Sequence, residues 1–328
     1  MQRIPYNAET RRASVRSCIF VSVDLTERYK WGEYVSVSVV TDSVASIPVE
    51  DGRAAGIEVV SMYVSDGETN QRELDMDVES FYHRIKDMHV LPTSSQPCVE
   101  AFVHAFGRAL EHGSEVLGVF VSHKMSGTID AARLAADIVL AERPGVRIEL
   151  LDAGSNSMQE GFGVLAAAQA AKAGETIERC MGLARETLDR TRFLFAPESL
   201  EYLRRGGRIG AASALIGSLL RIKPILTVEN GETTTFARVR SSSRALDEIV
   251  RQFSEDIAAH GLRQVIVHYI GEKAPAEHFA RERIEPLIGR SVRVLPVSPV
   301  VGLHVGPVVA IIYETERAWR TPALLLAE

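Results

Sequence analysis

The sequence predicts a two-domain α/β protein, with a parallel sheet and flanking helices in the first half and a mixed sheet with helices in the second. Its 328 residues are enough for two domains. In the first half, β-branched runs alternate with helical segments, which is typical of a parallel sheet covered by helices on both faces. In the second half, Asn230-Gly231 joins two strand-like runs as a tight hairpin turn. Antiparallel pairing is therefore expected in the second sheet.

Local signals give the elements of the first half. Asp77 is placed to cap a helix, Pro97 suits the first position of another, and Gly113 ends it. The predicted strands are 35–41, 57–64, 116–121 and 146–151, and the predicted helices are 77–89, 97–112, 129–140 and 161–173.

The second half mixes strands, helices and a glycine turn at Gly206-Gly207. The predicted strands are 193–196, 225–228, 233–239, 264–269, 292–297 and 308–313, and the predicted helices are 177–189, 211–220, 243–260 and 274–288. Glycine and serine gather at 154–161, where we expect a domain boundary. The expected division is an N-terminal extension over 1–33, a first domain over 34–157 and a second over 158–328, with a ligand tunnel between the two domains.

Composition excludes several classes of protein. A net charge of −6 argues against a general nucleic-acid binder. Three widely spaced cysteines, Cys18, Cys98 and Cys180, form no CxxC pair, so we expect neither a disulfide framework nor a metal site, and a reducing cytoplasm fits best. No apolar run is long enough to span a membrane, so no stable membrane insertion is expected. The apolar run at 18–23 is short and lacks a cleavage site, unlike a signal peptide.

Two hydroxyl-rich motifs stand before predicted helices. In Thr93-Ser94-Ser95-Gln96-Pro97 and in Ser126-Gly127-Thr128, hydroxyls lie beside the free backbone N–H groups of a helix start. Such a start is either a simple N-cap or an anion site. Two of them at neighbouring strand ends can converge on one carboxylate or phosphate. By contrast, Thr41-Asp42-Ser43 at the end of the first strand most simply forms a turn or caps the next helix.

Two further residues have both a structural and a functional interpretation. Arg208 follows Gly206-Gly207, and it either pins loop carbonyls or forks a ligand carboxylate. His304 stands in a loop bounded by glycine and proline, and a lone histidine is more often structural than catalytic. No histidine or cysteine flanks it at ligand spacing, so metal binding is not expected. Neither GxxxxGK[ST] nor GxGxxG is present at a strand end, so no common nucleotide loop is found.

Taken in order, these landmarks resemble the DegV family from about residue 35 to the end. The matching segments are Thr41-Asp42-Ser43, Thr93-Ser94-Ser95-Gln96-Pro97, Ser126-Gly127-Thr128, Leu203-Arg204-Arg205-Gly206-Gly207-Arg208-Ile209, Lys223-Pro224-Ile225-Leu226 and Gly302-Leu303-His304-Val305-Gly306-Pro307. The chain continues with Val308-Val309 where the family usually has Gly-Ala.

The resemblance implies a protein that holds one long-chain fatty acid between its domains, as its ligand and without another cofactor. Such a protein presents the carboxylate to a separate fatty-acid kinase catalytic subunit, which makes an acyl phosphate for phospholipid synthesis. By the same resemblance, the carboxylate would be held by hydroxyls of Thr93 or Ser94 and of Ser126, next to Gly127 and Thr128. His304 would complete the network, Arg208 would support the head-group region, and Arg240 would face the kinase.

The chemistry of the residues agrees with this implication, because a buried carboxylate is costly unless donors receive it. The alternative is a free-standing acyl-ester hydrolase that uses Ser126 and His304. The sequence shows no GxSxG elbow and no orienting acid in triad order, which such an enzyme would need.

Overall fold

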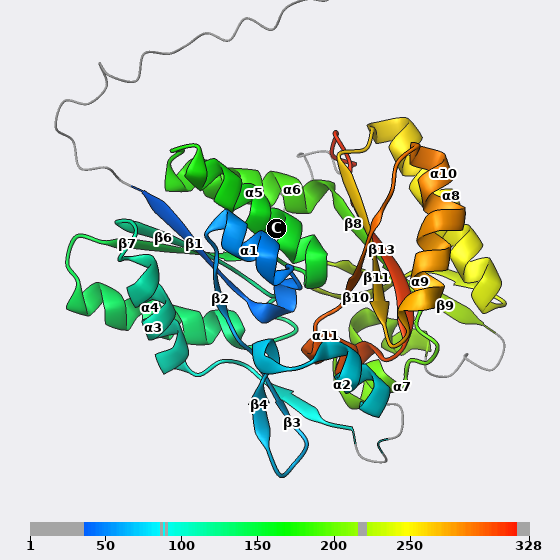
Figure 1. The fold of residues 1–328 in the computed structure, drawn as a ribbon, viewed down its shortest axis with the longest axis horizontal. Helices are drawn as coiled ribbons and strands as arrows, with labels where there is room; N and C mark the ends of the chain where they lie inside the picture. The colour runs from blue at the N-terminus through cyan, green and yellow to red at the C-terminus, as the bar shows by residue number, and fades with distance from the viewer. Residues whose placement is uncertain (1–35, 86–87, 89–90, 216–221, 320–328) are drawn as a thin grey trace, which may run out of the picture. The chain divides into compact units, whose positions relative to one another are not determined.

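The computed structural model describes residues 36–85, 88, 91–215 and 222–319 (Figure 1). Its first sheet is parallel throughout and has the strand order β2-β1-β6-β7. The strands are β1 (Val37–Asp42), β2 (Glu58–Val60), β6 (Glu115–Phe120) and β7 (Arg147–Asp152). The chain leaves β1 toward β2 on one side and returns as β6 on the other. The carboxyl ends of β1 and β6 therefore form a switch point, where open α/β sheets bind ligands.

Helices cover both faces of the parallel sheet, as predicted (Figure 1). Successive side chains of β1 point to opposite faces. Val40 packs with Phe102 in a cluster with α3 (Val99–Ala109) and α4 (Thr128–Glu142). Val39 packs with Val164 in a cluster with α5 (Ser157–Lys172) and α6 (Ile177–Arg190). Helix α1 (Val49–Ala55) packs against α5.

The second sheet is mixed, with the order β10-β9-β8-β13-β11-β12. Its strands are β8 (Thr191–Phe195), β9 (Lys223–Glu229), β10 (Glu232–Val239), β11 (Gln264–Ile270), β12 (Arg293–Pro296) and β13 (Val308–Glu314). Strands β11 and β12 pair in parallel and the other pairs are antiparallel. The predicted Asn-Gly hairpin is confirmed, since Asn230 and Gly231 both have positive φ, at 51° and 80°.

The two faces of the mixed sheet meet different partners. Leu194 and Ile225 face a cluster with Phe253 and Phe279, supplied by the helical layer that covers this side. That layer consists of α8 (Ser242–His260), α9 (Lys273–Phe279), a π-helical turn (Ala280–Ile284) and α10 (Glu285–Ile288). On the other face, Phe193 and Phe195 share a core cluster with residues from the first half of the chain, such as Phe162 of α5. The candidate site described below lies within this cluster.

A small antiparallel sheet, β4-β3-β5, was not predicted. It consists of β3 (Tyr63–Ser65), β4 (Asn70–Arg72) and β5 (Thr93–Ser95). The predicted strand 57–64 was wrong as a single element, because the chain leaves the parallel sheet after β2 and joins the small sheet as β3. A 3₁₀ turn (Glu73–Asp75) and α2 (Val78–Ile85) connect β4 to β5. Asp77 does cap α2, accepting a hydrogen bond from the Ser80 N–H at 2.7 Å.

Three further corrections concern helices. The predicted helix 97–112 begins only at Val99. The predicted loop around His304 was wrong, because His304 lies in α11 (Pro299–Val305). Within the predicted helix 211–220 the described part is a 3₁₀ helix (Gly210–Leu215), which follows α7 (Glu201–Arg205), and residues 216–220 lie outside the described residues.

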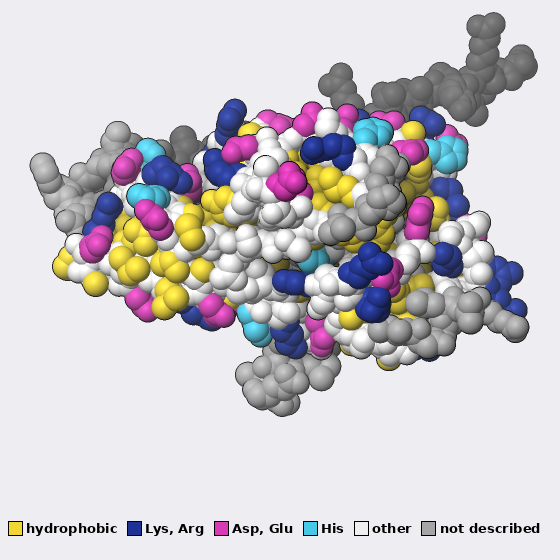
Figure 2. Space-filling model, turned by 90° about the horizontal axis from the view of Figure 1, so that it is seen from below, with side chains coloured by type: hydrophobic (Ala, Val, Ile, Leu, Met, Phe, Trp, Pro, Cys, Tyr) yellow, Lys and Arg dark blue, Asp and Glu magenta, His cyan; other side chains and the backbone are white. Residues whose placement is uncertain are grey.

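The predicted domain boundary falls in the first turn of α5. Helices α5 and α6 both pack on the parallel sheet, and the mixed sheet begins at Thr191. The expected extension over 1–33 lies outside the described residues. In the described part of the chain, no helix is both long and apolar enough to cross a bilayer. On the face shown in Figure 2, acidic and basic side chains are interspersed with apolar ones.

Candidate functional site

A cavity of about 270 Å³ lies at the carboxyl ends of the parallel strands. Val44 follows β1, Val121 follows β6 and Asn156 follows β7, and all three line it. The mixed sheet contributes Phe193, and α11 contributes His304. The cavity therefore sits at the switch point of the first sheet, facing the second.

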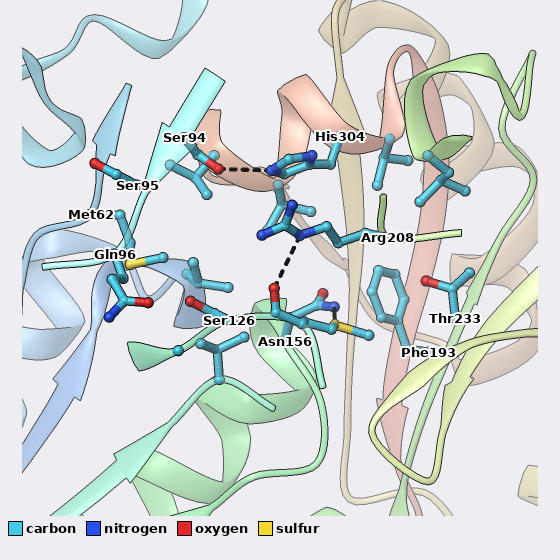
Figure 3. A pocket seen from close by; sticks show the side chains of 18 of the residues that line it. Met62, Ser94, Ser95, Gln96, Ser126, Asn156, Phe193, Arg208, Thr233 and His304 are labelled. Carbon is cyan, nitrogen blue, oxygen red and sulfur yellow. Dashed lines mark hydrogen bonds between the residues drawn. The ribbon is translucent and has the colours of Figure 1, made fainter. Parts of the chain in front are cut away.

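The lining divides into an apolar set and a polar set (Figure 3). The apolar side chains are Val44, Met62, Val121, Met125, Phe193, Phe195, Leu203, Val300, Val301 and Val305. The polar ones are Ser94, Ser95, Gln96, Ser126, Asn156, Arg208, Thr233 and His304. A mostly apolar cavity with a few convergent polar groups is the usual form of a small-molecule site.

Ser94 meets His304 at the polar side of the cavity (Figure 3). Ser94 is the central residue of β5, where Val64 of β3 is its partner. Because strand side chains alternate, Ser94 is half-buried while Thr93 and Ser95 are exposed. The Ser94 Oγ lies 2.8 Å from His304 Nε2. The small sheet thus supplies one partner of the pair and α11 the other.

The helix that carries His304 is held at its start by the first half of the chain. Ser298 caps α11 and Pro299 takes its first position. The buried Glu73 carboxylate accepts a hydrogen bond from the Val300 N–H at 2.6 Å and another from the Ser43 hydroxyl. Tyr82 donates its hydroxyl to the Val297 carbonyl at 2.7 Å. These bonds position α11, and with it His304, relative to the cavity.

His304 is neutral at physiological pH. Burial lowers its pKa to about 4, and the positive charge of Arg208 lowers it further in the same direction. Its Nδ1 is buried without a hydrogen-bond partner among the described residues. His304 therefore acts through hydrogen bonding rather than through positive charge.

Ser126 is held between β6 and α4. Its Oγ lies 2.7 Å from Thr128 Oγ1 and accepts from the Thr128 N–H at 3.3 Å. Thr128 is fully buried and does not line the cavity, whereas Ser126 and Gly127 do. Thr128 thus holds the Ser126 hydroxyl in position without lining the cavity itself. Gly127 caps the start of α4.

Arg208 pins loop carbonyls, as its structural interpretation predicted, and it also lines the cavity. Its Nε donates to the Met125 carbonyl at 3.1 Å (Figure 3). Its Nη1 donates to the Gly206 carbonyl at 2.6 Å. The side chain is exposed, so its charge lies where the cavity opens. Arg208 thereby joins the loop after β6 to the turn after α7.

The remaining predicted residues lie elsewhere. Thr93 is exposed and does not line the cavity. Arg240 is exposed one residue beyond the end of β10, and Arg238 is exposed within that strand. Asp42 has the capping role that its motif suggested, because it accepts from the N–H groups of Val44 and Val121, each at 2.9 Å. It joins the ends of β1 and β6 and does not line the cavity.

Val308, where the family usually has glycine, needs no glycine. It is the first residue of β13, it pairs with Ile270, and its φ is not positive. The departure from the family motif leaves the His304 helix intact.

The geometry does not assemble a hydrolase triad. His304 Nε2 bonds to Ser94 rather than to Ser126, and no carboxylate among the described residues bonds to its Nδ1. No group of three or more potential metal ligands occurs within residues 36–319 where these are described.

Sequence reasoning missed several lining residues. Met62 and Asn156 line the cavity, and Asn156 donates to the Met125 sulfur at 3.0 Å. Asn156 lies between the end of β7 and the start of α5, as Ser126 lies between the end of β6 and the start of α4, and this signal could have found it. Met62, between two short strands, carries no comparable signal.

Fold and site together define an α/β ligand-binding protein with an apolar cavity and a polar end. The chain belongs to the DegV family, whose family model matches residues 36–316. It is 37% identical over 292 residues to a DegV domain-containing protein of Clostridium acetobutylicum, covering 87% of this chain and 100% of that protein.

Solved structures agree with this assignment. One describes fatty-acid binding of a DegV family protein from Thermus thermophilus, with a TM-score of 0.75 and 28% identity, covering 85% of this chain and 100% of that one. Another is DegV, a fatty acid binding protein from Bacillus subtilis, with a TM-score of 0.78 and 28% identity, covering 86% and 99%.

Proposed function

We propose that this protein binds a long-chain fatty acid in the cavity and presents its carboxylate to a separate fatty-acid kinase subunit, which forms the acyl phosphate. In this proposal Ser94, Ser126 and Arg208 receive the carboxylate, and the valines and phenylalanines of the lining contact the chain. The protein itself carries out no chemistry.

The Ser94–His304 pair is the observation that carries the proposal. It places hydrogen-bonding groups at one side of a cavity whose other walls are largely apolar. A carboxylate loses several kcal/mol on burial unless donors replace its water, and a nearby guanidinium is its strongest partner. Arg208 provides that charge at the same side. An amphiphile with one anionic end matches this distribution.

The two related structures support the ligand class. Both are fatty-acid-binding proteins by description, and both share more than a quarter of their residues with this chain. The structural match covers nearly the whole of each of these two proteins.

Presentation to a kinase is consistent with where the polar groups lie. Arg208 is exposed, whereas Phe193 and Phe195 are buried, so a carboxylate beside Arg208 would be nearest to an incoming phosphate donor. The sequence has neither common nucleotide loop, so ATP would have to be bound by another subunit.

Reconstitution tests the proposal. Lipid-free protein is incubated with oleate and ATP, with and without a purified fatty-acid kinase catalytic subunit, and acyl phosphate is trapped with hydroxylamine. We expect product only when both proteins are present. Product without the kinase subunit would overturn the carrier role. Oleate binding without product in the presence of the kinase would overturn presentation alone.

A further inference from the structure

The two adjacent glycines of Arg205-Gly206-Gly207-Arg208 serve different purposes. Gly207 has a φ of +71° and no other atom within 4 Å of a side chain placed there, so it satisfies a backbone conformation. Gly206 has an ordinary helical φ of −72° and closes α7. A Cβ on Gly206 would overlap His304 Nδ1 and lie 3.1 Å from two other atoms of the imidazole ring. Position 206 must therefore be glycine, because a side chain there would overlap the His304 ring.

This contact determines what His304 Nδ1 can do. The Gly206 N–H already donates to the Tyr202 carbonyl at 2.9 Å, and the Gly206 carbonyl accepts from Arg208. Neither group serves Nδ1, which is buried without a partner among the described residues. A buried N–H without an acceptor costs more than an unused lone pair. The neutral ring therefore keeps Nδ1 bare and carries its proton on Nε2.

The position of that proton sets the direction of the bond to Ser94. With hydrogen on Nε2, His304 is the donor and Ser94 Oγ the acceptor over their 2.8 Å separation. A serine hydroxyl has one hydrogen to donate. Since the imidazole does not accept it, that hydrogen is available to a group in the cavity, which Ser94 lines.

We infer that Gly206 is a positioning residue that holds His304 in the Nε2–H tautomer and so makes Ser94 a hydrogen-bond donor to the ligand. The identity of the ligand as a fatty-acid carboxylate rests on the proposed function; the tautomer does not. The positive charge of Arg208 opposes protonation of the ring, in agreement with a neutral imidazole.

Nitrogen NMR of the lipid-free protein, labelled with ¹⁵N at histidine, tests the tautomer directly. His304 is assigned by comparison with His304→Gln. We expect one protonated nitrogen, at Nε2, and one bare nitrogen, at Nδ1. A proton on Nδ1, or on both nitrogens at neutral pH, would overturn the inference even if fatty acid binds. The expected tautomer in a protein that binds no fatty acid would instead count against the proposed function alone.

Substitution tests the role of Gly206. Gly206→Ala should displace the ring, abolish the tautomer signature and weaken oleate binding about tenfold or more, the loss that one buried hydrogen bond can represent. Gly206→Ala with His304→Ala should bind like His304→Ala alone, because the added methyl group then has room. Gly182→Ala is the matched control, since a side chain there meets no atom within 4 Å. An equal further loss in both backgrounds would show that Gly206 acts on something other than His304.

Discussion

The Ser94 Oγ and His304 Nε2 lie 2.8 Å apart although the residues are separated by 210 positions in the chain. Ser94 belongs to the small antiparallel sheet, and His304 to a helix that leads into the mixed sheet. The hydrogen bond therefore joins two parts of the chain across the cavity that both of them line. Formation of the polar end depends on the whole fold rather than on one local motif.

Removal of the Ser126 hydroxyl tests the second hydroxyl of the site. We expect Ser126→Ala to weaken fatty-acid binding by about 1–3 kcal/mol, because a buried carboxylate loses one donor. Calorimetric titration of the lipid-free protein with oleate measures the change. Thr93→Ala is the control, since Thr93 is exposed and does not line the cavity. Equal affinities of the native protein and Ser126→Ala would remove Ser126 from the binding site.

The Glu73 carboxylate should hold the His304 helix in place. In Glu73→Gln, one of the two oxygens that accept from the Val300 N–H and the Ser43 hydroxyl is replaced by an amide NH2 group, which cannot accept a hydrogen bond. We expect the free energy of unfolding to fall by about 1–3 kcal/mol, because one buried donor is left without an acceptor. Hydrogen exchange should accelerate at Val300, and Glu50→Gln, on the exposed start of α1, should leave it unchanged. Unaltered exchange at Val300 in Glu73→Gln would show that other contacts hold α11.

Buried histidines should make the fold sensitive to acid. Burial lowers the pKa of both His268 and His304 from 6.5 to about 4. Between these values the unfolded chain binds protons that the folded chain does not. Each histidine therefore contributes stability above 6.5 that is lost as the pH falls toward 4. Asp42 has the opposite effect on stability, because burial raises its pKa from 3.8 to about 7. Between these values the folded chain binds a proton that the unfolded chain does not, so acidification favours the folded state.

The test compares urea unfolding of native protein and His268→Gln across this pH window. The variant should lose less stability on acidification, by up to about 1.4 kcal/mol per pH unit, since one proton fewer is taken up on unfolding. Parallel curves for the two proteins would mean that the pKa of His268 is not lowered in the folded state.

Charge reversal at Arg240 tests the proposed kinase-facing surface. Arg240→Glu should slow acyl-phosphate formation by the reconstituted pair while oleate binding stays unchanged. Loss of an interfacial charge pair costs about 2–5 kcal/mol when the pair is buried and far less at the rim. Arg53→Glu makes the same change on α1 and serves as control. Equal rates for both variants at limiting protein would exclude Arg240 from the interface.

Much of the site could be predicted because its signals are local. Ser126-Gly127-Thr128 follows a strand and begins a helix, and the structure places it so. Arg208 was expected near a ligand or pinning carbonyls, and it lines the cavity while bonding two carbonyls.

The remainder depends on contacts between distant residues. Strand β5 has three residues and exists because it pairs with β3, so its own sequence suggested only a helix start. The glycines at 302 and 306 led to the prediction of a loop where the structure has α11. Ser298-Pro299, however, is a recognisable start of a helix. Position 302 is glycine because the Tyr82 ring occupies the space that a side chain would need there. The need for Gly206 likewise appears only once His304 is placed against it.

Mass spectrometry of the organic extract from purified, denatured protein tests the central claim most directly. The cavity and its polar end predict about one long-chain fatty acid per protein molecule, with a clear loss in Ser94→Ala. A native protein that yields no fatty acid and cannot be loaded with oleate, yet hydrolyses acyl esters, would contradict the account and favour an enzyme.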